Sequence, residues 1–223
     1  MADVIERAPK VELHLHLEGA IPLPAMWQLV HGYGDPRARS LEEFRARFEY
    51  RDFAHFIETW QWMLPFIRTP ADWTFVAQAV ARSLAEQHIV YAEASISPTD
   101  FRQHELSVAE IATAVRCGLD EVEGTHVNLL VGLVRDTGPE WCGRSLEQVI
   151  EVAPEAGIVG ITIGGSEHGY PPGGYASVYQ RAAEAGLGRS AHAGEAAGPE
   201  SVWAALRDLG VERVGHGVRA VED

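Results

Sequence analysis

The feature that most constrains the fold is a regular alternation of short apolar runs with longer segments of helical spacing. The runs of strand length lie at residues 11–17, 89–96, 127–134, 158–163, 190–193 and 213–217. The segments with helical spacing lie at residues 41–62, 71–87, 108–122, 145–152, 175–185 and 199–209. This alternation predicts an α/β fold in which parallel strands are joined by right-handed crossovers. The first crossover is long, and we expect residues 22–88 to form a helical elaboration within it.

The first run distinguishes a barrel from an open doubly wound sheet. Its side chains alternate between two faces of the strand. One face is polar and carries Glu12, His14, His16 and Glu18; the other carries Leu13, Leu15 and Leu17. An open doubly wound sheet needs two apolar faces. In a barrel, the leucines pack outward on helices and the polar face points into the lumen. The pattern therefore favours a (β/α)8 barrel of the TIM type.

The number of repeats is smaller than a closed barrel requires. Such a barrel has eight strands and about 250 residues, whereas six βα units account for this chain up to Asp223. We therefore expect residues 1–223 to be a single, C-terminally incomplete domain. We also expect it to be unstable or inactive alone, because two strand edges would be unpaired.

Charge and composition exclude several classes of partner and site. The formal net charge is −14, so we expect neither nucleic acid nor an anionic membrane as a partner. Cys117 and Cys142 lie far apart without a C-x-x-C spacing, which excludes a disulfide framework, a thiolate zinc site and an iron–sulfur cluster. The first ten residues lack the apolar core of a signal peptide, and no run approaches the roughly 18 apolar residues of a membrane span. These features predict a cytoplasmic protein.

Candidate site residues lie within or directly after four of the strand-length runs. They are the pair His14 and His16, the segment His192-Ala193-Gly194-Glu195, His216 between two glycines, and a glycine turn at residues 163–168. Each signal is weak alone, since it also fits a solvated strand face, a surface turn or a core histidine. All four nevertheless fall at the carboxyl ends of strands, where β/α barrels carry their active sites. The only lysine, Lys10, is not on a middle strand, so we expect one metal ion and no lysine-bridged pair.

Three segments of the chain resemble the motifs of the adenosine deaminase family, whose members are zinc hydrolases on a β/α barrel that remove the 6-amino group of a purine. The segments are E-L-H-L-H-L-E-G-A at 12–20, H-A-G-E at 192–195 and R-V-G-H-G at 213–217. The resemblance implies one zinc ion bound by His14, His16 and His192. It implies that Glu195 protonates the purine ring and that His216 orients the metal-bound hydroxide. It also implies substrate contacts from His16, Glu18 and Gly165.

The chain departs from the family pattern at several positions, which leaves the substrate open. The paired aspartates of the family's last strand are absent, Glu18 stands where adenosine-specific members have aspartate, and Thr162 and Ser166 replace acids. Adenosine is the first choice, with inosine and ammonia as products. The alternatives are free adenine, another aminated purine nucleoside such as aminodeoxyfutalosine, or attack on another amidine-like or cyclic amide bond. In a different class, the chain is an inactive metal-binding fragment.

The chemistry makes its own demands on these residues. An aromatic amine leaves only after water adds to the ring, and zinc lowers the pKa of its water to about 7. Protonation of the ring nitrogen beside the attacked carbon removes the charge that attack would build. We therefore expect Glu195 to be shielded from water and to have a raised pKa. The cytidine type of zinc deaminase is excluded, because its cysteine signature is missing.

Overall fold

A computed structural model describes residues 2–98 and 104–223. Its framework is one sheet of six parallel strands whose spatial order equals their order in the chain. The strands are β1 (Lys10–His16), β2 (Ile89–Ile96), β3 (His126–Val134), β4 (Ile158–Gly164), β5 (Gly188–Ala193) and β6 (Arg213–His216). Each begins and ends within two residues of the run predicted for it.

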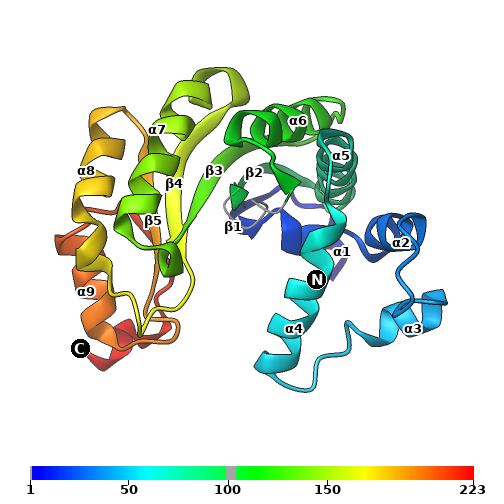
Figure 1. The fold of residues 1–223 in the computed structure, drawn as a ribbon, viewed down its shortest axis with the longest axis horizontal. Coiled ribbons are helices and arrows are strands. Elements are labelled where there is room, and N and C mark those ends of the chain that lie inside the picture. The colour runs from blue at the N-terminus through cyan, green and yellow to red at the C-terminus, as the bar shows by residue number, and fades with distance from the viewer. Residues whose placement is uncertain (1, 99–103) are drawn as a thin grey trace.

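Helices follow the strands and cover the outside of the curved sheet (Figure 1). They are α5 (Pro70–Glu86), α6 (Val108–Asp120), α7 (Pro139–Ala156), α8 (Ala176–Glu184) and α9 (Pro199–Arg207). The 3-10 turns η4 (Arg135–Thr137), η5 (Pro172–Tyr175) and η6 (Val218–Glu222) lie in the connections after β3, β4 and β6. Together the six units form a nearly closed barrel, which confirms the predicted fold class. In the described part of the chain, β1 pairs only with β2 and β6 only with β5, so the barrel is open between them.

The N-terminal third adds short helices to this framework. Helix α1 (Ala2–Arg7) precedes β1, and the crossover to β2 contains η1 (Glu18–Ala20), α2 (Leu23–Gly32), α3 (Leu41–Ala46), α4 (Phe53–Met63) and η2 (Leu64–Phe66) before α5. The prediction of one helix over residues 41–62 was wrong. Asp52 begins a new helix there, because its side chain accepts a hydrogen bond from the amide of His55 at 2.8 Å.

A second helix is longer than predicted. The pattern predicted residues 145–152, whereas α7 runs from Pro139 to Ala156. Pro139 suits a first helical position, and Gly157 ends the helix in the left-handed conformation. Pro154 lies inside the last turns of α7. Within residues 2–98 and 104–223, no helix is long and apolar enough to cross a membrane.

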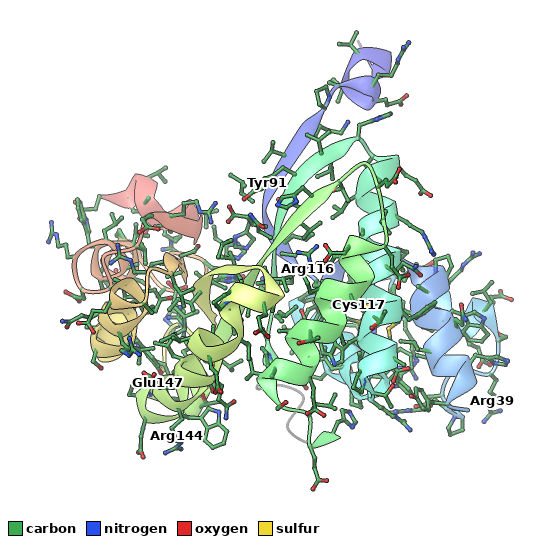
Figure 2. The ribbon with its side chains drawn as sticks, turned by 90° about the horizontal axis from the view of Figure 1, so that it is seen from above. Arg39, Tyr91, Arg116, Cys117, Arg144 and Glu147 are labelled. Atoms are coloured by element: carbon green, nitrogen blue, oxygen red, sulfur yellow. The ribbon has the colours of Figure 1, made fainter. Side chains whose placement is uncertain are left out.

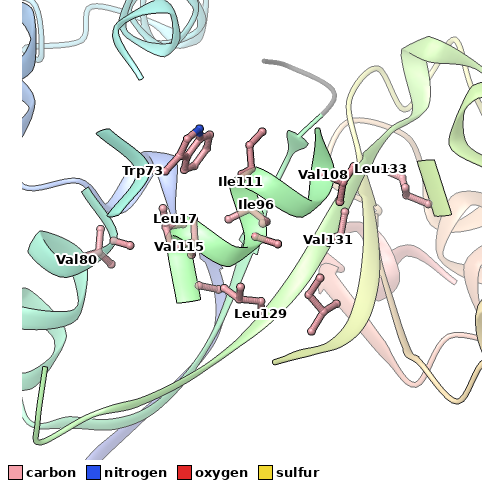
Figure 3. Packing of buried hydrophobic residues seen from close by; sticks show 14 of the residues in the cluster. Leu17, Trp73, Val80, Ile96, Val108, Ile111, Val115, Leu129, Val131 and Leu133 are labelled. Atoms are coloured by element: carbon pink, nitrogen blue, oxygen red, sulfur yellow. The ribbon is translucent and has the colours of Figure 1, made fainter. Parts of the chain in front are cut away.

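The main core lies between the sheet and the helices α5 and α6. Figure 3 shows Trp73 and Val80 of α5 and Ile111 of α6 facing the strand residues Ile96 and Leu129. Both helices begin with a capping box, in which a threonine or serine and an acid three residues later bond each other's backbone amides. This packing fixes the carboxyl ends of β2 and β3.

The outer face of β1 differs from the expectation. Leu17 is fully buried, but Leu13 is 44% exposed and Val11 59% exposed. Two features account for this. Strand β1 is an edge strand, and its pairing with β2 shifts register between Glu12 and Leu15. Leu17 itself lies just beyond the strand, at the start of η1.

The close approach of α5 and α6 provides a stability test. A Cβ atom added at Gly118 would lie 2.2 Å from the carbonyl oxygen of Thr74, and backbone atoms cannot move aside easily. We expect Gly118→Ala to lower the free energy of unfolding by about 1–3 kcal/mol, because overpacked cores lose that much. Gly143→Ala in α7 is the matched control, since no atom lies within 4 Å of its added Cβ. Urea unfolding should show a loss for the first variant and no loss for the second; equal stabilities would contradict the packing described here.

Candidate active site

Three histidines converge at the carboxyl ends of two strands that are far apart in the sheet. His14 and His16 come from β1 and His192 from β5. One ring nitrogen of each lies within 4.8 Å of the others, and the ring centroids are 5.7, 4.7 and 5.0 Å apart. Strands β1 and β5 are separated by three others in the sheet order. The rings therefore meet only because the sheet curves into a barrel.

Glu195 and His216 complete this cluster. Strand β6 pairs with β5 so that His216 stands opposite Ala193. The carboxylate oxygen Oε2 of Glu195 lies 3.5 Å from Nδ1 of His192 and 3.4 Å from Nε2 of His216. His216 has a φ of 64°, which costs energy for a residue other than glycine and is common at functional sites. The structure thus brings together five of the predicted site residues.

Burial disfavours the charged form of His14, His16 and His216. Burial lowers the pKa of His16 to about 4, with further lowering by the neighbouring imidazoles of His192 and His14. Burial also lowers the pKa of His14 and of His216. Neutral imidazoles keep a lone pair free for a cation. Three nitrogen donors within reach of one another suit zinc, which takes three histidines in several catalytic sites.

A side chain of β2 orients one of these rings. The hydroxyl of Ser95 lies 3.2 Å from Nδ1 of His16. A hydrogen bond at one ring nitrogen fixes the tautomer and leaves the other nitrogen available to a metal. The side chains of His14, His16 and His192 line a pocket whose walls also include Glu93, Leu130, Thr162 and Ser190.

The environment of Glu195 differs from the expectation. Its side chain is 40% exposed. Its pKa is lowered, chiefly by the hydrogen bond from His192 and also by His216, and these effects outweigh the raising effect of burial. The expected raised pKa was therefore wrong for this arrangement, in which two imidazoles stabilise the ionised carboxylate.

The predicted substrate-contacting residues Glu18 and Gly165 lie around the cluster. Glu18 is only 1% exposed, and its Oε1 accepts a hydrogen bond of 2.9 Å from the amide of Ser97, just after β2. Gly165 has a φ of 99°, and a Cβ atom there would lie 2.1 Å from Oδ2 of Asp136. That same oxygen accepts the amide of Ser166 at 2.7 Å. This amide of the glycine turn is therefore bonded within the protein, and the substrate roles of Glu18 and Gly165 stay predictions.

Two charged residues at the site were given no role by the sequence analysis. Arg135 and Glu167 are 0% and 5% exposed, and both bond backbone groups of the segment that carries His192 and Glu195. Burial by itself raises the pKa of Glu167, but hydrogen bonds from Ser201 and from backbone amides lower it to about 2. The signals in the sequence were the position of each residue at or shortly after a strand end and, for Glu167, its place in the glycine turn at residues 163–168.

Gly215 sits between two of the imidazoles, which makes it a sensitive test of the cluster. A Cβ atom there would lie 2.4 Å from Cε1 of His14 and 3.3 Å from Cδ2 of His192. We expect Gly215→Ala to displace the His14 ring and weaken zinc binding by about tenfold or more, as disturbed support of a metal ligand does. The control is Gly174→Ala, whose added Cβ meets no atom within 4 Å. Zinc titration should separate the two variants; equal affinities would contradict the placement of His14.

Comparisons with known proteins agree with the geometry. The aminodeoxyfutalosine deaminase of Streptomyces avermitilis is 33% identical over 224 residues, which cover 96% of this chain and 62% of that protein. The adenine deaminase of Bordetella parapertussis is 30% identical over 227 residues, which cover 100% of this chain and 71% of that protein. The chain thus spans less than two thirds of the first relative's length.

Similar solved structures include an amidohydrolase from Burkholderia ambifaria with bound zinc. It has a TM-score of 0.89 and 25% identity, and the match covers 99% of this chain and 62% of that one. The sequence model of the family described as adenosine deaminase matches residues 9–223, which includes every predicted site residue. The chain belongs to the adenosine deaminase family.

Proposed function

We propose that the whole protein hydrolyses the 6-amino group of an aminopurine, with adenosine to inosine and ammonia as the first choice. The observation that carries this proposal is the convergence of His14, His16 and His192 with Glu195 and His216 at one end of the barrel. Membership of the adenosine deaminase family supports the same reaction.

In this proposal, His14, His16 and His192 hold one zinc ion. The fit rests on the donor set: three imidazoles close enough for their ring nitrogens to share one ion. A bound zinc would lower the pKa of its water to about 7 and so supply a nucleophile at neutral pH. The amidohydrolase from Burkholderia ambifaria, solved with bound zinc, supports the choice of metal.

Glu195 and His216 would assist the proton transfer and the addition of water in this reaction. Water adds to the carbon that bears the amine while a ring nitrogen takes a proton. The added hydroxyl then loses its proton to the amine, the carbon–nitrogen bond breaks, and ammonia leaves a carbonyl group behind. Glu195 is placed to give the proton to the ring nitrogen, and His216 to hold the attacking water. Because Glu195 is partly exposed, a purine that covers it would remove water and raise its pKa toward the value an acid needs.

His16, Glu18 and Gly165 would contact the substrate in this arrangement. A second candidate substrate group is free adenine or another aminated purine nucleoside, such as aminodeoxyfutalosine. The names of the two relatives favour it, as does the glutamate at position 18. The carboxylate of Glu18 is buried and bonds the amide of Ser97 just after β2. In this proposal, Glu18 helps to position the residues that contact the substrate at the end of β2.

The test is release of ammonia by the zinc-loaded whole protein from adenosine, adenine and aminodeoxyfutalosine, with dihydrouracil as a cyclic amide. We expect ammonia from at least one aminopurine and no ring opening of dihydrouracil. Ring opening of dihydrouracil without release of ammonia would favour the alternative of a hydrolase that attacks a cyclic amide bond. Ammonia from the whole protein but not from residues 1–223 alone would assign the inactive-fragment role to this chain.

We also propose a cytoplasmic protein with a small-molecule substrate and without nucleic-acid or membrane partners. The negative charge and the two cysteines without a disulfide support this. A single domain over residues 1–223, with residues 22–88 as its helical elaboration, stays a prediction.

A further inference from the structure

Two buried charges lie directly behind the candidate site. Arg135 stands in η4, immediately after β3, and Glu167 stands in the loop that follows β4. They are 0% and 5% exposed. A buried charge is costly unless hydrogen bonds satisfy it, so the partners of these two residues indicate what they hold in place.

The guanidinium of Arg135 joins the carboxyl ends of three strands. Its Nη2 donates to the carbonyl oxygen of His192 at 2.6 Å, its Nε to that of Gly164 at 3.3 Å, and its Nη1 to that of Tyr170 at 3.1 Å. The hydroxyl of Tyr175 in turn donates to the Arg135 carbonyl oxygen. One rigid planar group thus fixes the backbone of His192 relative to the ends of β3 and β4.

The carboxylate of Glu167 holds the next segment. It accepts the consecutive amides of Gly194 at 2.6 Å, Glu195 at 3.1 Å, Ala196 at 2.7 Å and Ala197 at 3.0 Å. Successive amides that converge on one anion form a tight loop. This loop carries Glu195 toward His192 and His216.

We propose that Arg135 and Glu167 are positioning residues with separate tasks: Arg135 fixes His192 for metal binding, and Glu167 fixes the loop 194–197 that aims Glu195. The assignment rests on the proposed function, since it takes His192 as a metal ligand. Arg135 bonds the backbone of His192, whereas the carboxylate of Glu167 bonds the amides of residues 194–197, which follow His192. Their removal should therefore produce different defects.

The first arm of the test measures Co²⁺ binding to the whole protein by its visible absorption. We expect Arg135→Met to weaken Co²⁺ binding about 10- to 100-fold, as loss of a residue supporting a metal ligand does, and to change the shape of the spectrum. Arg135→Lys, which keeps the charge but not the planar fork, should restore part of the affinity. The control is Arg144→Met, since Arg144 lies on the surface of α7 (Figure 2) and pairs with Glu140. Wild-type affinity and spectrum in a folded Arg135→Met or Arg135→Lys protein would overturn this half of the proposal.

The second arm measures amide hydrogen exchange at residues 194–197. Glu167→Gln keeps the size of the side chain but replaces one carboxylate oxygen by an NH2 group. This group donates hydrogen bonds and would face the backbone N–H groups of residues 194–197, which are donors too. We expect exchange there to rise at least tenfold, while Co²⁺ affinity stays within about twofold of the wild type. Glu147→Gln on the surface of α7 is the control (Figure 2). Unchanged exchange in Glu167→Gln would overturn the second half.

The two arms also separate this inference from the function on which it rests. A wild-type protein that binds no Co²⁺ would reject the metal site and, with it, the task given to Arg135. The exchange measurement needs no metal, so it would still decide whether Glu167 holds the loop.

Discussion

Glu195→Gln is expected to lower turnover of the zinc-loaded whole protein by about 100- to 10,000-fold, the range that general acid–base catalysis contributes. Glutamine has nearly the same size and keeps the position of the side chain, but it cannot give a proton to the purine ring. Since Glu195 is not among the three proposed zinc ligands, zinc content should be unchanged. Ammonia release and zinc content are measured on the same preparation.

Glu155→Gln is the matched control, because Glu155 is exposed on α7 and far from the cluster in the chain. It should keep wild-type turnover. Near-normal turnover in Glu195→Gln, with zinc content unchanged, would remove Glu195 from the mechanism and favour a different hydrolase.

His192→Ala is expected to weaken zinc binding by more than about 100-fold, because even residues that only support a ligand contribute 10- to 100-fold. His14 and His16 lie on one strand and supply two nitrogens, so loss of His192 removes the donor from the opposite wall of the barrel. The measurement is competition for zinc with a chelating dye, alongside circular dichroism to confirm folding.

The control for this variant is His126→Ala. His126 begins β3, at the opposite end of the strands, and its Nε2 lies 3.1 Å from the side-chain oxygen of Asn128. We expect wild-type zinc affinity in His126→Ala. If both variants bind zinc equally well, the assignment of His192 as a ligand is wrong.

The barrel and its strands were predictable because their signals are local. A strand is defined by a few apolar residues in a row, and the run at 89–96 is reproduced without change by β2. The alternation along β1 also predicted that His14 and His16 share a face. That His192 joins them follows from the rule that barrels gather functional groups at the carboxyl ends of their strands.

The errors arose where tertiary contacts decide the outcome. Helical spacing continues across residues 47–52, but the Asp52 cap divides the segment into α3 and α4. The exposure of Leu13 arises because β1 is an edge strand in the described part of the chain, which the sequence of β1 alone does not reveal. The pKa of Glu195 depends on two imidazoles that are brought to it from β5 and β6.

Arg135 and Glu167 show a different limit of sequence reasoning. Most of their hydrogen-bond partners are backbone groups of residues 27 to 57 positions away. Backbone groups carry no sequence signature, so the glycine turn at residues 163–168 drew attention to the segment of Glu167 but not to its bonds, and no motif drew attention to Arg135. Only the folded barrel reveals which carbonyl and amide groups they bond.

X-ray absorption at the zinc edge of the zinc-loaded protein tests the central claim most directly, because it reports the atoms bound to the metal. The account predicts three imidazole nitrogens at about 2.0–2.1 Å and the loss of one imidazole in His192→Ala. A wild-type spectrum without imidazole nitrogens, or one that His192→Ala leaves unchanged, would contradict the claim that His14, His16 and His192 form a zinc site.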